Sequence, residues 1–254
     1  MPPIHAIASP LPRLKTYCSQ SSGRKGTRYG WPAASSGFAL RSKRKKFGWN
    51  IDMKLYVTLG SPYARLARIV VIEKALEDRV EIIAAKTRAA DSPYYEINPS
   101  GRVPYLIDDT GVGMEDSQLI CAYLDNLDGK PRFHDARRQT HWHYQRLEFS
   151  ARSMCEGICV WLREMARPAS ERSPTALAHE VARAQRMANV FEGYVADPLM
   201  QTAPTMAHLI LAVALDVAAK RGFGDLTDGR PQLAAWMRSI NSKLPSMQRT
   251  APPS

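Results

Sequence analysis

Three short runs hold the hydroxyl, acid and proline residues with which this chain can do chemistry. They are Ser61-Pro62-Tyr63, Asn98-Pro99-Ser100-Gly101-Arg102-Val103-Pro104, and Asp116-Ser117. The second run is a turn that delivers a Val-Pro bond to the start of a strand, where peptide groups can pair with an extended ligand. The third run places an acid and a hydroxyl at a helix start, where unbonded N–H groups attract a carboxylate. Together they predict a site for a small peptide with a free α-carboxylate.

Ser61 is the candidate catalytic residue. It stands before Pro62 at a predicted helix start, a position typical of an N-cap that is worth about 1 kcal/mol to the helix. The same hydroxyl can donate a hydrogen bond to an ionised sulfur, and a helix N-terminus stabilises negative charge. Tyr56 and Tyr63 are the competing hydroxyls, of which Tyr56 lies inside a predicted strand.

The elements that must position these residues alternate between strands and helices. Apolar periodicity, turn residues and caps predict the order β-α-β-(α)-β-β-α, which is that of the thioredoxin-like fold. The first β-α-β unit implies parallel strands. The expected strands are 54–59, 80–84, 103–107 and one beginning at 112, and the expected helices are 62–76, 94–97 and 117–127.

After Pro131 the strand signals end and only helical patterns follow. The predicted helices are 136–167, 174–197, 204–220 and 231–243. In the third of these, apolar residues recur at helical spacing, which indicates a buried helix. The sequence therefore predicts a mixed α/β region followed by an all-helical one.

The three runs, in this order, resemble the glutathione-binding domain of the glutathione transferase family, and the resemblance to bacterial members covers roughly Met53 to the C-terminus. In that family the proline of the Val-Pro pair is cis. The resemblance implies a thioredoxin-like glutathione-binding domain at 53–130 and an all-helical glutathione transferase C-terminal domain at 136–250. Residues 1–52 lie outside it.

The resemblance also implies a role for each candidate residue, with glutathione as the co-substrate and no metal. Ser61 is the catalytic hydroxyl that hydrogen-bonds the glutathione sulfur. Val103-Pro104 offers backbone groups to the cysteinyl unit, and Asp116-Ser117 holds the γ-glutamyl end. Arg102 is placed to reach the glycyl carboxylate, although a solvated side chain is an equal alternative.

The function implied is a glutathione S-transferase that conjugates the glutathione thiolate to a small hydrophobic electrophile. We expect a cytoplasmic, homodimeric protein with a detoxification role. Two alternatives stay open: a glutathione-dependent disulfide reductase and a non-catalytic glutathione-transferase-like interaction module. Ser61-Pro62-Tyr63-Ala64 also resembles the Cys-Pro-Tyr-Cys run of glutaredoxins without either thiol, which excludes protein dithiol exchange at this site.

The distribution of charge argues against nucleic acid as the partner. The formal net charge is +11, but residues 1–52 contain ten Lys/Arg and one acid, whereas the other 202 residues contain 25 Lys/Arg and 23 Asp/Glu. Nearly all the basicity thus belongs to the first segment, so the overall charge says little about what the folded part binds.

The first 52 residues are rich in Ser, Gly, Pro and basic residues and show no hydrophobic period. This composition predicts disorder. A solvated tail and an organelle transit segment are two interpretations. The third, which we favour, is that translation begins at Met53, because that residue leads directly into the first predicted strand.

The cysteines and the apolar runs bear on compartment. The four cysteines, Cys18, Cys121, Cys155 and Cys159, form no disulfide framework and no zinc spacing, which suits a reducing cytoplasm. The longest apolar run falls far short of the ~20 residues of a membrane span, so we expect no membrane partner.

One departure from the family pattern concerns the helix at 204–220. Family members carry Ser/Thr-x-x-Asp there, a capping box, and this chain has Thr205-Met206-Ala207-His208. Thr205 can still cap, but we expect His208 not to replace the acceptor role of the acid. The expected consequence is lower folding stability rather than altered catalysis.

Overall fold

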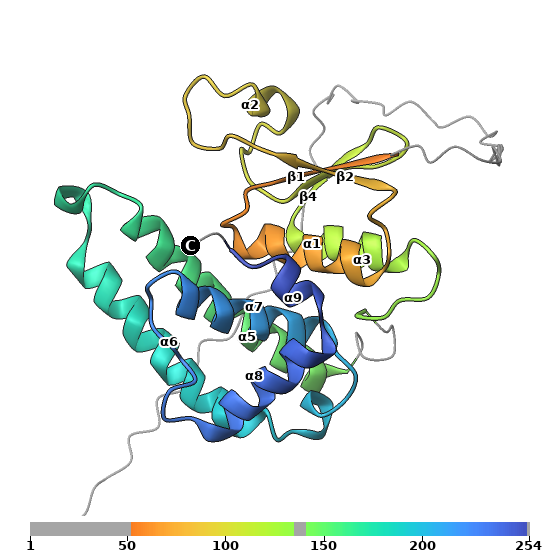
Figure 1. The fold of residues 1–254 in the computed structure, drawn as a ribbon. Helices are drawn as coiled ribbons and strands as arrows, with labels where there is room; N and C mark the ends of the chain where they lie inside the picture. The colour runs from red at the N-terminus through yellow and green to blue at the C-terminus, as the bar shows by residue number, and fades with distance from the viewer. Residues whose placement is uncertain (1–51, 135–140, 253–254) are drawn as a thin grey trace, which may run out of the picture. The chain divides into compact units, whose positions relative to one another are not determined.

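A computed structural model describes residues 52–134 and 141–252 (Figure 1). The predictions made for residues 1–51 lie outside the described residues. The four strands all precede residue 116, and the long helices from Trp142 onward follow them. A mixed sheet with helices followed by a helical C-terminal region confirms the predicted fold class, thioredoxin-like and then all-helical.

The sheet has the strand order β2-β1-β3-β4. Strand β1 (Met53–Val57) pairs in parallel with β2 (Val80–Ala84) and antiparallel with β3 (Tyr105–Ile107). Strand β4 (Gly113–Glu115) pairs antiparallel with β3. The strands of the central pair are shorter than predicted, since β1 ends at Val57 and β3 begins after the Val-Pro pair.

Helices α1 (Pro62–Glu73) and α3 (Ser117–Asn126) pack against each other and lie on the same side of the sheet (Figure 1). Both are amphipathic, and their apolar residues reach the core because they recur at helical spacing. The short helix α2 (Tyr94–Ile97) was predicted with the same bounds. Tyr94 of α2 contacts Tyr56 of β1, with ring centroids 5.7 Å apart.

The helical region centres on α7 (Met206–Lys220), which is buried on nearly all sides. Helix α5 (Trp142–Met165) packs against both α7 and α6 (Pro174–Tyr194), and α8 (Pro231–Lys243) packs against α6 and α7. A helix that is apolar all round must be enclosed in this way. Two 3₁₀ turns, Ala169–Glu171 and Pro198–Met200, join the helices.

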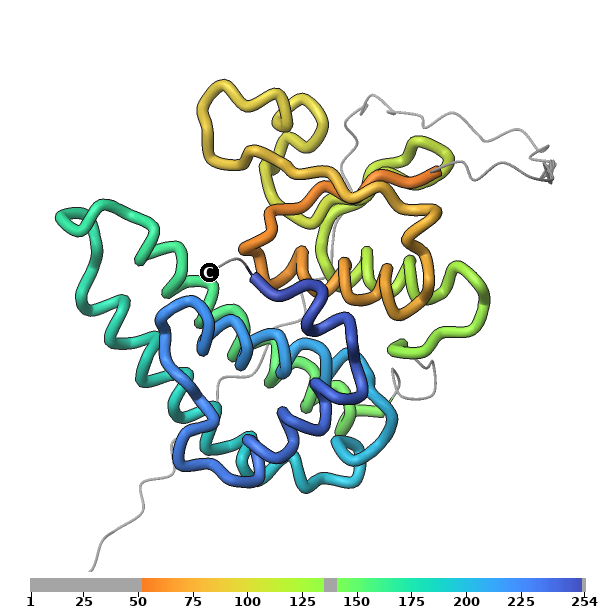
Figure 2. Tube along the Cα trace, in the orientation of Figure 1, coloured from red at the N-terminus to blue at the C-terminus, as the bar shows by residue number. Residues whose placement is uncertain are grey.

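The two regions meet where α1 packs on α7. The guanidinium of Arg65, 1% exposed, bonds Asp216 Oδ2 at 2.6 Å and the Met247 carbonyl at 2.8 Å. Helix α9 (Ser246–Arg249), which the sequence did not reveal, thus lies beside α1, as the dark blue and orange tubes show (Figure 2). A buried cation of this kind is stable only because its charge and donors are satisfied.

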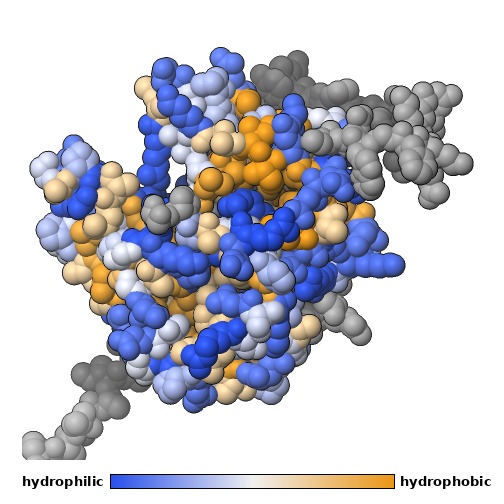
Figure 3. Space-filling model, in the orientation of Figure 1, coloured by the Kyte–Doolittle hydropathy of each residue, from blue (hydrophilic) through white to orange (hydrophobic). Residues whose placement is uncertain are grey.

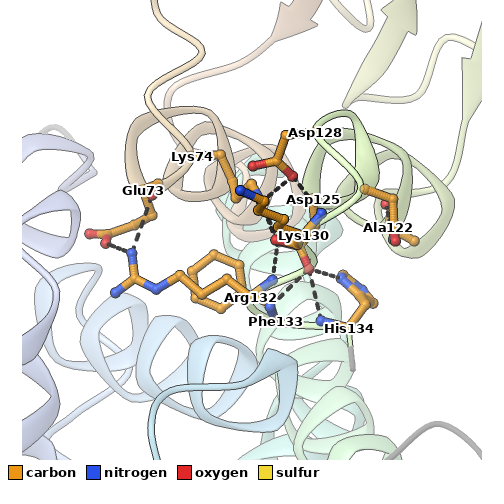
Figure 4. Close-up of polar contacts among 10 residues, drawn as sticks. Glu73, Lys74, Ala122, Asp125, Asp128, Lys130, Arg132, Phe133 and His134 are labelled. Carbon is orange, nitrogen blue, oxygen red and sulfur yellow. Dashed lines mark hydrogen bonds and ion pairs between the residues drawn. The ribbon is translucent and has the colours of Figure 1, made fainter. Parts of the chain in front are cut away.

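A second junction surrounds Asp125 near the end of α3 (Figure 4). Its carboxylate accepts the backbone N–H groups of Arg132, Phe133 and His134 at 2.8–2.9 Å and lies 3.1 Å from the His134 ring Nδ1. A carboxylate only accepts, so Nδ1 carries the proton. Lys74, at the end of α1, lies 3.7 Å from the same carboxylate. This cluster fixes the chain as it leaves the thioredoxin-like region.

The prediction of one helix over 136–167 is wrong at its start. Helix α5 begins at Trp142, and His141 has the extended angles φ −94° and ψ 106° of an N-cap. The Nδ1 of His141 accepts the N–H of Tyr144 at 3.4 Å. A histidine cap is easily missed because Ser, Thr, Asp and Asn are the usual caps. Residues 135–140 lie outside the described ranges.

The expectation that His208 cannot take the acceptor role is also wrong, while the expected effect on folding stability stays a prediction. Its ring Nδ1 accepts the backbone N–H of Thr205 at 3.2 Å, which completes the capping box that an acid would otherwise provide. The other ring nitrogen faces the Met200 carbonyl at 3.1 Å, so it carries the proton. The ring is fully buried and stacks on Trp236. A neutral imidazole can therefore replace the carboxylate as an acceptor.

The surface seen in Figure 3 is mostly hydrophilic, with an apolar area at the level of the strands. Among residues 52–134 and 141–252, no helix combines the length and the apolarity that crossing a bilayer requires.

Candidate functional site

The sheet register brings the three predicted runs to one end of the sheet. Tyr56 of β1 pairs with Tyr105 of β3, which pairs with Glu115 of β4. Ser61 follows the end of β1, Val103-Pro104 immediately precedes Tyr105, and Asp116 immediately follows Glu115. The three runs therefore follow or precede strand residues at the same end of the sheet, although 56 positions separate Ser61 from Ser117.

Ser61 is the N-cap of α1. Its Oγ accepts the N–H of Ala64 at 3.3 Å, and Pro62 follows as the first helical residue. Since Oγ acts as the acceptor in this bond, the hydroxyl hydrogen is free to be donated elsewhere. The first turn of α1 contains no acid, so the positive end of the helix dipole is not neutralised there.

The two competing tyrosines are packed. Tyr63 is half-buried and packs against the core near Cys155 and Cys159 of α5, and burial, with smaller contributions from these thiols, raises its pKa well above the ordinary value. Tyr56 is 9% exposed and its ring is packed on Tyr94. Ser61 is half-exposed and is the hydroxyl that caps the N-terminus of α1, whereas the Tyr63 ring packs against the core.

The Val103-Pro104 bond is cis, as the resemblance implies. Pro104 is buried and Val103 half-buried. Within the described ranges, no group bonds the N–H or the C=O of Val103. Such unpaired peptide groups at the start of a strand are what an extended peptide ligand can use.

A network that the sequence did not reveal holds this turn. Asn98, 3% exposed, donates to the Arg102 carbonyl at 3.0 Å, and the Tyr94 hydroxyl donates to the same carbonyl. The Ser100 hydroxyl donates to Glu115 of β4 at 2.5 Å. The turn before Val103 is thus braced against both α2 and β4. The only sequence signal was the Asn-Pro-x-Gly run, whose side-chain partners lie on other elements.

Gly101 shows why the turn needs glycine. Its φ is +66°, and a Cβ there would lie 2.6 Å from the ring of Tyr95. Any other residue would have to move that ring.

Asp116 and Ser117 open helix α3. Asp116 is exposed and has φ +76° and ψ 123°, an uncommon conformation for a residue other than glycine. Its Oδ1 accepts the N–H of Gln118 at 2.7 Å. Ser117 is 6% exposed and is the first residue of the helix. Backbone strain at an exposed helix start is the kind of outlier that clusters at ligand sites.

Arg102 is exposed, and no acid of the described residues pairs with its side chain. The nearest acid along this edge, Glu115, is engaged by Ser100 and Asn98. The guanidinium is therefore available to an anion.

The described residues contain no group of three or more His, Cys, Asp or Glu side chains placed to hold one metal ion. Two surface cavities, of about 520 and 350 Å³, are lined by residues 225–231 and by residues around Trp236. Neither of these two cavities is lined by a residue of the three runs.

The fold and this edge define a thioredoxin-like domain of the glutathione transferase type. Residues 55–132 match the family described as Glutathione S-transferase, N-terminal domain. The chain is 28% identical over 205 residues to the uncharacterized GST-like protein YibF of Escherichia coli K12. The alignment covers 79% of this chain and 99% of that protein.

Solved structures agree. A glutathione transferase family member from Pseudomonas fluorescens Pf-5 with bound glutathione is 27% identical, with a TM-score of 0.68, and covers 80% of this chain and all of that one. A glutathione S-transferase from Methylobacillus flagellatus KT with bound glutathione has a TM-score of 0.69 at 23% identity, covering 79% of this chain and all of that one, which supports the fold alone. Residues 55–132 thus match a glutathione S-transferase N-terminal domain, and the chain as a whole is similar to proteins described as glutathione-transferase-like.

Proposed function

We propose that this protein binds glutathione and transfers its thiolate to a small hydrophobic electrophile. In this proposal a glutathione-binding domain (53–130) and a helical domain (136–250) form the reaction site together, without a metal. The observation that carries the proposal is the pairing of Tyr56 with Tyr105 and of Tyr105 with Glu115. At this end of the sheet lie the Ser61 hydroxyl, the unpaired peptide groups of Val103 and the strained start of α3.

The proposed role of Ser61 is to stabilise the thiolate. A free thiol has a pKa near about 8.5 and is only slightly ionised at neutral pH. A hydrogen bond to an ionised group is worth about 1.5–3 kcal/mol, or roughly one to two pKa units. The Ser61 hydroxyl and the N-terminus of α1 together would leave about half or more of the thiol ionised. The thiolate then attacks the electrophile, a carbon–sulfur bond forms, and the leaving group departs.

The remaining residues hold glutathione in place. Val103, beside Pro104, pairs with the peptide groups of the cysteinyl unit. The hydroxyl of Ser117 and the N-terminus of α3 bind the γ-glutamyl carboxylate. Asp116 lies near the ammonium of the same unit, and Arg102 reaches the glycyl carboxylate. These contacts position the thiol, which is how binding energy contributes to rate.

Calorimetric titration of glutathione into the protein tests this proposal. We expect Ser117→Ala to weaken binding about tenfold, which corresponds to about 1.4 kcal/mol. Ser61→Ala is the matched control, because it removes a hydroxyl of the same size from the other helix start. It should leave affinity nearly unchanged and raise the pKa of the bound thiol, read from thiolate absorbance against pH.

Absence of glutathione binding to the folded wild-type protein would remove the transferase proposal and favour the non-catalytic interaction module. Binding without conjugation, together with turnover of a glutathione mixed disulfide, would instead favour the disulfide reductase.

We further propose that the protein is a homodimer that works in a reducing cytoplasm, in detoxification. Trp142 is 83% and Phe149 51% exposed, and they lie two turns apart on one face of α5. Large exposed apolar side chains favour a protein partner. Light scattering should give twice the 28.4 kDa chain mass. A monomer at micromolar concentration would contradict the dimer.

A further inference from the structure

Arg221, the C-cap of helix α7, lies in a tight turn near the candidate site. The N–H groups of Phe223 and Gly224 both bond the Ala218 carbonyl, at 3.1 and 3.2 Å. Gly222 and Gly224 have φ of +79° and +123°, which this tight turn requires. The Phe223 ring packs edge-on against Trp161 of α5, with centroids 4.9 Å apart. The backbone on either side of Arg221 is therefore fixed.

The guanidinium of Arg221 lies against the turn that precedes Ser61. A Cβ built on Gly60 would be 2.8 Å from the Arg221 Nη1, so the absence of a side chain at residue 60 is what permits this approach. Gly60 is the residue immediately before the N-cap of α1. A side chain of the helical region thus reaches the start of α1.

The charge of Arg221 is not used by the protein. Asp216, one turn earlier on α7, pairs with Arg65 at 2.6 Å and with Lys220 at 3.0 Å. In the described part of the chain no acid pairs with Arg221, whose side chain is exposed. The guanidinium beside Gly60 therefore carries a positive charge that no acid of the described residues pairs.

We propose that Arg221 determines specificity by pairing with a carboxylate on the electrophile, so that the preferred second substrate is an organic acid. This inference rests on the proposed function. The residues proposed for glutathione all lie between 61 and 117, and they already include partners for both of its carboxylates. Arg221 comes from the other region, and its guanidinium lies against Gly60, the residue before Ser61. A guanidinium offers two parallel N–H groups, which match a carboxylate.

Two matched probes test the preference: 4-(bromomethyl)benzoate and 4-(bromomethyl)benzamide. In each, the glutathione thiolate attacks the benzylic carbon, the carbon–sulfur bond forms, the carbon–bromine bond breaks, and bromide leaves while the thiol proton passes to solvent. They differ in charge at the far end of the ring. The quantity of interest is the ratio of the two kcat/KM values, each corrected for the uncatalysed rate.

We expect the wild-type protein to favour the benzoate, and Arg221→Gln to lower the ratio about tenfold, the effect of losing one hydrogen-bonded charge. Lys220→Gln is the control, because it removes a neighbouring cation that Asp216 already pairs. It should keep the wild-type ratio. A ratio that is equal in the wild type and Arg221→Gln would overturn the proposal.

A second measurement keeps the test independent of catalysis. Unreactive 4-methylbenzoate is titrated into the wild-type, Arg221→Gln and Lys220→Gln proteins without glutathione, with 4-methylbenzamide as the neutral reference. Weaker benzoate binding in Arg221→Gln alone supports the carboxylate site, whether or not the bromides react. If in addition glutathione does not bind and neither bromide reacts, the transferase proposal fails while the carboxylate site stands. Equal benzoate binding by all three proteins would overturn the role of Arg221.

Discussion

Helix α3 has an acid at each end, and the two acids have opposite surroundings. Asp116, before its first turn, is exposed and makes one hydrogen bond, to the Gln118 N–H. Asp125, in its last turn, is fully buried and accepts from three consecutive backbone N–H groups and from the ring of His134. The same residue type therefore stabilises the fold at one end and stays available for a ligand at the other.

The pKa of Asp125 shows the effect of these hydrogen bonds. Burial by itself would raise the pKa, but the bonds from His134 and from the backbone outweigh it and lower the pKa to about 2. The carboxylate is thus held ionised inside the protein. A buried charge is acceptable only when it is paired in this way. An acid whose bonds are complete has no capacity left for a ligand, whereas Asp116 does.

Replacing Asp125 by Ala is expected to have the largest effect. The substitution leaves two buried N–H groups, the part-buried N–H of Arg132 and the His134 ring without their acceptor, and removing one partner of a buried ionic cluster costs about 3–5 kcal/mol. Asp116→Ala, at the other end of the helix, should cost only the N-cap, about 1 kcal/mol. Urea unfolding of both variants measures the difference.

Equal losses of unfolding free energy in the two variants would contradict the comparison, because they would mean that Asp125 acts as no more than a helix-end residue. If Asp125→Ala fails to fold, Asp125→Asn, which keeps one acceptor oxygen, provides the intermediate value.

The pH dependence of stability is the second way to separate the two acids. The folded pKa of Asp125, about 2, lies below the ordinary 3.8. A lowered pKa contributes stability that is present above the unfolded pKa and is lost as the pH falls through the folded pKa. Asp125 should contribute about 2 kcal/mol at pH 5 and lose most of it by pH 2.

The measurement is the difference in unfolding free energy between the wild type and Asp125→Asn at pH 5 and at pH 2. The gap should narrow by about 2 kcal/mol, since Asn cannot titrate. A gap that stays constant would show that the bonds around Asp125 do not depend on its charge.

The sequence predicted one end of this helix better than the other. The start at Ser117 and the cap by Asp116 were predicted from a local run of residues, since a cap and a helix N-terminus are set by near neighbours, and the ligand role of Asp116 stays a prediction. The role of Asp125 depends on residues 132–134, which return to it only after the chain has turned at Gly129. No local pattern in the sequence predicts this contact between Asp125 and residues 132–134.

The same limit explains what was missed around the site. Sheet topology and helix α1 follow from alternation, capping and proline position, all of which are local. The brace by Tyr94 and Glu115, and the approach of Arg221 to Gly60, depend on contacts between elements far apart in sequence. His208 was misjudged for another reason. The residue type expected there was an acid, and the acceptor capacity of a neutral ring was overlooked.

The comparison can be sharpened by making one substitution at both ends of α3. Asp116→Asn removes a charge but keeps an N-cap acceptor, and Asn tolerates the positive φ of this position. We therefore expect unchanged unfolding free energy and a loss of about 1 kcal/mol in glutathione binding, the contribution of an exposed ion pair. Asp125→Asn, chemically the same change, should lower stability and leave glutathione affinity unaltered.

Calorimetric titration and urea unfolding of the two variants give four values. Asp116→Asn should change only the glutathione affinity, and Asp125→Asn should change only the unfolding free energy. The reason is that a fully bonded acid has its effect on folding, whereas a partly bonded one at an exposed helix start has its effect on the ligand. Should Asp116→Asn destabilise the fold and bind glutathione like the wild type, Asp116 would be a structural cap. The γ-glutamyl ammonium would then need a different partner.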